Sequence, residues 1–83
     1  MKKIKWVKKI ERISDSGEVK ESIYKPEKGK GGISIVTVKR AIRLQSGSRW
    51  ETMSVRVHKD GATLKTNYDT FEKACAAAER MMN

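Results

Sequence analysis

The residues with the clearest chemistry lie on one segment in which apolar and polar side chains alternate. Arg49 is followed directly by Trp50, and Arg56 and His58 come two residues apart further along. Side chains two apart on an extended strand lie about 6.5–7 Å from each other on one face, close to the spacing of successive phosphates. An exposed Trp can stack on an unpaired base, which contributes ~1–3 kcal/mol. The segment therefore favours contact with a nucleic acid, whereas a place at the sheet edge or in the core is the structural alternative for Trp50.

Further basic side chains extend this candidate surface. Lys39 and Arg43 lie four residues apart in a neighbouring run. The stretch 25–32 is rich in Gly and Lys and is expected to be a flexible basic loop that clamps phosphates. The full set of candidate nucleic-acid-binding residues is Lys28, Lys30, Lys39, Arg43, Arg49, Trp50, Arg56, His58 and Lys65.

We expect neither a catalytic nor a metal centre. One His and one Cys are too few for a usual four-ligand zinc site, and no nucleophile motif is present. The cluster of Gly29, Gly31 and Gly32 lacks the Gly-Lys-Ser/Thr ending of a phosphate-binding loop. Cys75 is most simply a buried small apolar residue. We therefore expect a protein that is not an enzyme and that needs no cofactor.

The charge distribution indicates a polyanionic partner. The chain has 83 residues and a net charge of +9. Residues 1–12 carry six basic residues against one acidic, and residues 36–59 again carry six against one. Two such blocks are the electrostatic pattern of a nucleic-acid-binding protein, and a solvated, solubilising surface is the other interpretation.

Length and composition also limit the class of protein. Eighty-three residues suffice for a single small domain, 1–83. No apolar run approaches the ~20 residues of a membrane span, and the Lys-rich start is not followed by the apolar stretch of a signal peptide. A single Cys suits a reducing compartment, so we expect a cytoplasmic protein without a membrane partner.

Hairpin signals divide most of the chain into strands. Turn-forming clusters, each flanked by β-branched runs, lie at 14–17, 46–48 and 60–61. The strands that they predict span 3–13, 18–24, 33–44, 49–58 and 62–68. A helix is the rival at 3–13, because Ile10 lies four residues after Trp6 and turn residues are absent.

The C-terminal segment predicts a helix over 70–82. Asp69 suits the N-cap position and Glu72 follows three residues later, as in a capping box. An apolar stripe with helical spacing consists of Phe71, Ala74, Cys75, Ala78 and Met81 or Met82. The expected fold class is therefore α+β, an antiparallel sheet of four to five strands with one C-terminal helix packed on one face.

Alternation within the two best strands predicts which side chains are buried. In 33–44 the residues assigned to the core share one parity: Val36, Val38, Ile42 and Leu44. In 49–58 the residues assigned to the core are Met53, Val55 and Val57. The side chains expected on the exposed face of that strand are Trp50, Thr52, Ser54, Arg56 and His58.

Residues 33–82 resemble DNA-binding domains built from a three-stranded sheet and a helix. The matching positions are Trp50, the Asp60-Gly61 turn, Tyr68, Thr70, Ala74 and Ala78. The families with this pattern are domains of the ethylene-response-factor type and the arm-binding domains of tyrosine integrases. There the sheet enters the major groove, and Arg and Trp side chains on the strands contact DNA. The resemblance implies DNA contacts for Arg43, Arg49, Trp50 and Arg56.

Functions of more than one class fit the sequence. The favoured one is a small, non-enzymatic nucleic-acid-binding protein that uses a basic, Trp-bearing sheet face, with DNA preferred over RNA. The alternative is a protein-binding modulator or inhibitor that docks its basic face on an acidic partner surface, and a structural subunit of a ribonucleoprotein is a third. A homodimer is compatible with each, because an unpaired strand at a sheet edge can pair with a second copy.

Overall fold

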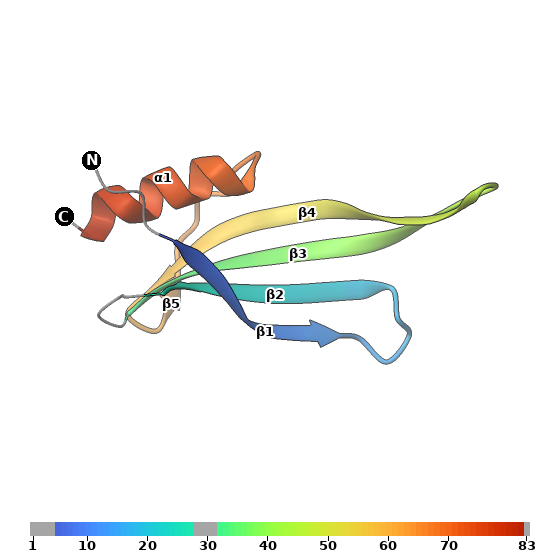
Figure 1. Ribbon diagram of the computed structural model, residues 1–83, viewed down its shortest axis with the longest axis horizontal. Coiled ribbons are helices and arrows are strands. Elements are labelled where there is room, and N and C mark those ends of the chain that lie inside the picture. Colours follow the sequence, from blue (N-terminus) through green and yellow to red (C-terminus); the bar gives the residue numbers. More distant parts are fainter. Residues whose placement is uncertain (1–4, 28–31, 83) are drawn as a thin grey trace.

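The computed structural model of the protein describes residues 5–27 and 32–82. Five strands precede one helix: β1 (Trp6–Ile13), β2 (Val19–Pro26), β3 (Ile33–Leu44), β4 (Gly47–Lys59), β5 (Ala62–Thr63) and α1 (Phe71–Met82) (Figure 1). The strands form one antiparallel sheet in the order β1-β2-β3-β4-β5. This confirms the predicted α+β class, and it excludes a helix over Trp6–Ile13.

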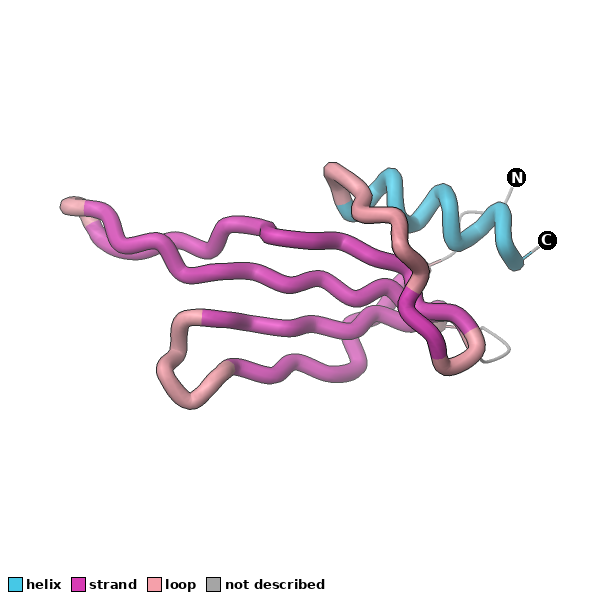
Figure 2. The backbone as a smooth tube through the Cα atoms, turned by 180° about the vertical axis from the view of Figure 1, so that it is seen from behind, coloured by secondary structure: helices cyan, strands magenta, loops and turns pink. Residues whose placement is uncertain are grey.

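The helix covers only one end of one side of the sheet. α1 contacts β3 and β4 and lies across the end of the sheet that carries β5 (Figures 1 and 2). At the other end the β3–β4 hairpin projects, because β2 pairs with β3 only as far as Val19↔Arg40 whereas β3 and β4 pair as far as Leu44↔Gly47. The molecule is therefore elongated, with extents of 46 × 24 × 23 Å.

Two of the three predicted turns lie where the sequence places them, whereas the turn between β3 and β4 falls at residues 45–46 and not at 46–48, because Gly47 and Ser48 belong to β4. Asp60 and Gly61 both adopt positive φ, 52° and 86°, which suits a two-residue Asp-Gly turn between β4 and β5. Between β1 and β2, the amide of Gly17 donates to the Ser14 carbonyl at 2.8 Å. The predicted strand 33–44 coincides with β3.

The core lies between α1 and the ends of β3 and β4 beneath it. Its buried side chains are Ile33, Ile35, Val55, Val57, Ala74 and Ala78. Phe71, at the start of the helix, extends the contact to Tyr24 of β2, and the two ring centroids are 4.6 Å apart. The small alanines allow α1 to lie close to the sheet, as the predicted stripe requires.

The sequence prediction chose the wrong side of β3 for the core. Ile33 and Ile35 are 9% and 0% exposed beneath the helix. Val36 and Val38 point away from α1 and are only half-buried, and Leu44 on their side is 46% exposed. Both parities of this strand are apolar near its start, so alternation alone could not decide which one α1 covers.

The predicted strand 62–68 is wrong beyond Thr63. The following segment runs along the edge of β4 without regular pairing. There the Asn67 side-chain oxygen accepts a hydrogen bond from the Val55 amide at 2.9 Å, and the Tyr68 amide donates to the Val55 carbonyl at 2.8 Å. The Asn67 side chain thus takes the place of a backbone carbonyl as the acceptor for the Val55 amide. The hydrogen bonds of this edge are made in this way without a further strand.

The helix begins one residue later than predicted, and Thr70 caps it rather than Asp69. The Thr70 hydroxyl accepts a hydrogen bond from the Lys73 amide at 3.2 Å, the geometry of an N-cap. The Asp69 carboxylate instead accepts from the Lys73 ammonium at 3.3 Å on the exposed side of the helix.

Within the described residues, no helix is long and apolar enough to cross a membrane.

Candidate nucleic-acid interface

The pairing register divides the sheet into two faces. Residues directly opposite each other in an antiparallel sheet point to the same side, and successive residues alternate. Ile35 and its partners Tyr24 and Val57 point toward α1, and we call this side the helix face. Val36 and its partner Arg56 point to the other side, which we call the open face because none of the described elements covers it (Figure 2).

A β-bulge in β4 decides on which face the tryptophan lies. The pairing of β3 and β4 shifts between Val38 and Lys39, which leaves Met53 as an extra residue of β4. Alternation therefore reverses at Met53, so Trp50 points to the helix face whereas Arg56 points to the open face. The predicted common face for these two residues is wrong. Met53 is 50% exposed and does not belong to the core that the sequence assigned to it.

Three basic residues from two strands share with Trp50 the part of the helix face that α1 leaves uncovered. Lys39 and Arg43 lie on either side of Ala41 on β3, and Ala41 pairs directly with Trp50. Lys20 of β2 pairs with Lys39 and places its ammonium 4.4 Å from the centre of an indole ring. We call Lys20, Lys39, Arg43 and Trp50 the Trp50 surface. The indole is 38% exposed.

Sequence reasoning missed Lys20 as part of this surface. It lies on β2, far from Trp50 along the chain, and only the β2–β3–β4 register brings the two together. The available signal was parity, because Lys20 shares the parity of Tyr24, whose ring packs against the helix. Parity gives the face of β2 on which Lys20 lies, but only the register between β2 and β3 shows that Lys20 lies beside Lys39 and close to Trp50.

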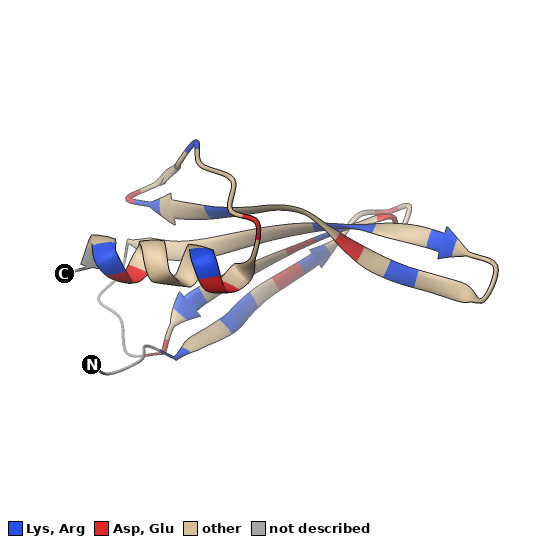
Figure 3. Cartoon of the chain, turned by 90° about the horizontal axis from the view of Figure 1, so that it is seen from above, with Lys and Arg blue, Asp and Glu red and all other residues tan. Residues whose placement is uncertain are grey.

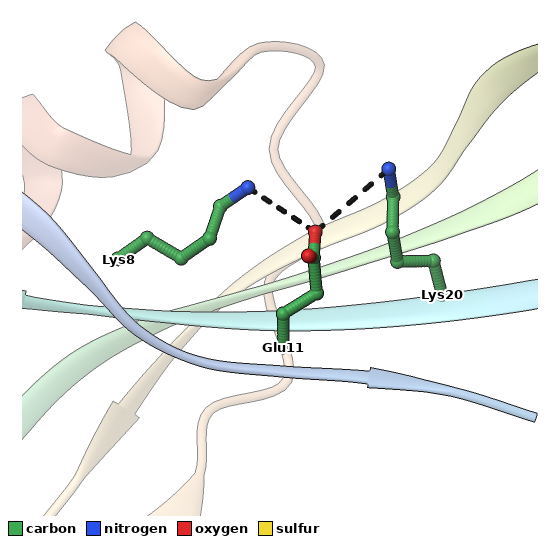
Figure 4. A network of polar contacts seen from close by, with 3 residues as sticks. All are labelled: Lys8, Glu11 and Lys20. Carbon is green, nitrogen blue, oxygen red and sulfur yellow. Dashed lines mark hydrogen bonds and ion pairs between the residues drawn. The ribbon is translucent and has the colours of Figure 1, made fainter.

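Glu11 is the internal counter-ion of this region. Its carboxylate oxygen lies 3.2 Å from the Lys8 ammonium and 3.8 Å from the Lys20 ammonium (Figure 4). The hydrogen bond from Lys8 to Glu11 raises the pKa of Lys8 above its ordinary value. Lys20 is thus held between a carboxylate and the Trp50 ring, and only 18% of its side chain is exposed.

The other predicted strand residues lie on the open face. Arg49 pairs with Ile42, and Arg56 pairs with Val36, so both arginines point away from the helix. His58 is on the same face, and its Nδ1 lies 3.0 Å from the Thr63 hydroxyl. This contact joins β4 to β5, so His58 has a structural role. Basic side chains therefore lie on both faces of the sheet. Figure 3 shows how the basic residues are distributed along the strands.

The remaining candidates do not join the Trp50 surface. Lys65 is exposed in the segment after β5, and the positions of Lys28 and Lys30 lie outside the described residues.

Burial, assisted by the nearby charges of Glu79 and Glu72, raises the pKa of Cys75 to about 11. Its thiol is therefore protonated near neutral pH and is a poor nucleophile. Among the described residues, no group of three His, Cys, Asp or Glu side chains could hold a metal ion.

Comparison of the chain with protein-family models, curated proteins and solved structures finds no match. The resemblance of residues 33–82 to sheet-and-helix DNA-binding domains therefore stays a prediction.

Proposed function

We propose that the protein binds nucleic acid, DNA in preference to RNA, through the Trp50 surface and catalyses no reaction. The observation that carries the proposal is that Trp50 shares the uncovered part of the helix face with Lys20, Lys39 and Arg43. Lys39 and Arg43 are four residues apart on β3, about 13 Å, which spans roughly two phosphate spacings. A base stacked on Trp50 would then lie between two phosphate contacts.

The same geometry favours an unpaired base over a base pair. Stacking on an indole needs access to the flat face of a base, which a duplex keeps inside its stack. Ala41, directly opposite Trp50, has a small side chain, and Trp50 is 38% exposed. In the free protein the Lys20 ammonium lies 4.4 Å from the centre of an indole ring. When a base stacks on the indole, this ammonium can form an ion pair with a phosphate instead.

The test is fluorescence anisotropy of a labelled single-stranded DNA, with duplex DNA and RNA of the same sequence, at two salt concentrations. We expect Trp50→Ala to weaken single-strand binding about 5- to 150-fold, which corresponds to ~1–3 kcal/mol of stacking. Arg43→Ala should weaken binding to every sequence and reduce the salt slope by about 0.7, because one phosphate contact is lost.

Arg56→Ala is the matched control. Like Arg43 it is an exposed arginine on the same β3–β4 pair, but it points to the open face. Equal losses from Arg43→Ala and Arg56→Ala would indicate diffuse attraction to a basic protein rather than a site. If none of the three nucleic acids binds at low salt, the proposal is wrong, and docking of the basic face on an acidic protein surface becomes the better explanation.

A further inference from the structure

The open face carries a large aliphatic surface that the nucleic-acid proposal does not use. Among the described residues, the aliphatic side chains on this face, assigned from the register, are Val7, Ile10, Val19, Ile23, Val36, Val38, Ile42 and Leu44. Three of these, Ile10, Val19 and Leu44, are 36%, 39% and 46% exposed. Exposed aliphatic side chains that gather on one face of a small protein often mark an interaction site, so we expect this face to be covered.

The aromatic residues argue against a nucleic acid as the covering group. The β-strand aromatic side chains in the described chain, Trp6, Tyr24 and Trp50, all point to the helix face. A base that approached the open face would meet aliphatic side chains without an aromatic ring for stacking. The aliphatic centre therefore fits a protein surface better than a nucleic acid.

Charged residues of both signs lie among these aliphatic side chains. Arg12 stands directly opposite Glu21, and Arg40 stands directly opposite Glu51, all on the open face. A two-fold interface uses the same patch on both subunits, so it needs both signs of charge within that patch. Arg40 lies between Val38 and Ile42 on β3, and arginine is one of the residues enriched in protein interfaces.

The area is sufficient for a dimer. β1 and β2 are 8 residues long, and β3 and β4 extend beyond them. Four strands of this length cover roughly 26 × 19 Å, about 500 Å² per copy as a flat projection. Two copies would bury about 1,000 Å² or more, since side chains make the true surface larger, and this reaches the lower limit for a biological interface.

We propose that the open face packs against the open face of a second copy of this chain, as two stacked sheets. The small core explains the need, because a short chain buries too little apolar surface on its own. The Trp50 surface stays on the outside of such a dimer, so the proposal does not depend on nucleic-acid binding. The basic residues of the open face exceed its acids, so screening by salt should strengthen the dimer, whereas salt weakens nucleic-acid binding.

Sedimentation equilibrium of the full chain, over a range of protein and salt concentrations, tests the proposal. We expect a dimer that tightens with added salt. Val19→Lys and Ile10→Lys, each of which adds a charge within the aliphatic surface, should weaken dimerisation at least about tenfold. Ile13→Lys is the matched control, because Ile13 is 56% exposed and pairs with Lys20 on the helix face.

Three results would overturn the proposal. The first is a wild-type chain that stays monomeric up to about 200 µM, a concentration well above the micromolar Kd of the weaker specific interfaces. This result needs only the wild-type protein, so it does not depend on whether the variants fold. The second is a dimer that Ile13→Lys disrupts and Val19→Lys leaves intact, which would place the interface on the helix face. The third is a monomer whose affinity for single-stranded DNA falls more with Arg56→Ala than with Arg43→Ala, which would make the open face the nucleic-acid site. Circular dichroism of each variant shows whether the sheet is retained.

Discussion

Removal of the Glu11 charge should make the protein bind nucleic acid more tightly. Glu11 holds the ammonium groups of Lys8 and Lys20 at 3.2 and 3.8 Å, so it occupies two cations that could otherwise contact phosphates. A nucleic acid that binds the Trp50 surface must compete with this carboxylate. Glu11→Gln keeps the size and the hydrogen-bonding oxygen of the side chain but removes its charge.

The expected gain follows from counterion release. On a single strand, each additional phosphate neutralised steepens the slope of log K against log salt by about 0.7. At about 0.1 M salt one extra contact therefore raises the affinity about fivefold, and two raise it about 25-fold. We expect Glu11→Gln to fall within this interval, depending on whether Lys20 alone or both lysines reach the strand.

The assay is the anisotropy titration of single-stranded DNA at several salt concentrations, with Glu51→Gln as the control. Glu51 is also an exposed strand carboxylate, but it pairs with Arg40 on the open face. Screening at about 0.1 M salt, with a Debye length near 10 Å, should limit its effect to less than about twofold. Equal gains from both variants would refute the competition, as would an unchanged salt slope for Glu11→Gln with the fold intact.

Three further predictions concern stability and reactivity. Phe71→Ala should destabilise the fold by about 3 kcal/mol, because the ring packs at 4.6 Å from Tyr24 and starts the helix; a urea denaturation midpoint close to that of the wild type would contradict this packing. In the same experiment, Thr70→Ala should lower the free energy of unfolding by about 1 kcal/mol, and Asp69→Ala should lower it clearly less. If Asp69→Ala has the larger effect, Asp69 and not Thr70 is the N-cap residue. Cys75, with a pKa of about 11, should react with iodoacetamide slowly at neutral pH and increasingly as the pH approaches that value, whereas in urea the rise should begin near the ordinary thiol pKa. Because the folded thiol keeps its proton longer than the unfolded one, this group lowers stability only as the pH rises above its ordinary pKa; a native reaction rate that matches the rate in urea at every pH would contradict the shift.

The sequence by itself determined the features that depend on neighbouring residues. The Asp60-Gly61 turn was predictable because both residues tolerate positive φ, and the predicted strand 33–44 has the same limits as β3. The helix over Phe71–Met82 followed from a stripe of apolar residues with a period of 3.6. The antiparallel strands up to residue 59, the Asp60-Gly61 turn and the C-terminal helix could therefore be derived without tertiary information.

Only the tertiary structure decided which face each side chain occupies. β3 is apolar on both parities near its start, so the covered side became definite only when α1 packed on Ile33 and Ile35 rather than on Val36. The bulge at Met53 then placed Trp50 and Arg56 on opposite faces, and the register of β2 brought Lys20 to the indole. The physical reason is that alternation has a period of two, so one unpaired residue reverses every side chain beyond it, and such a residue is defined only by the strand with which it fails to pair.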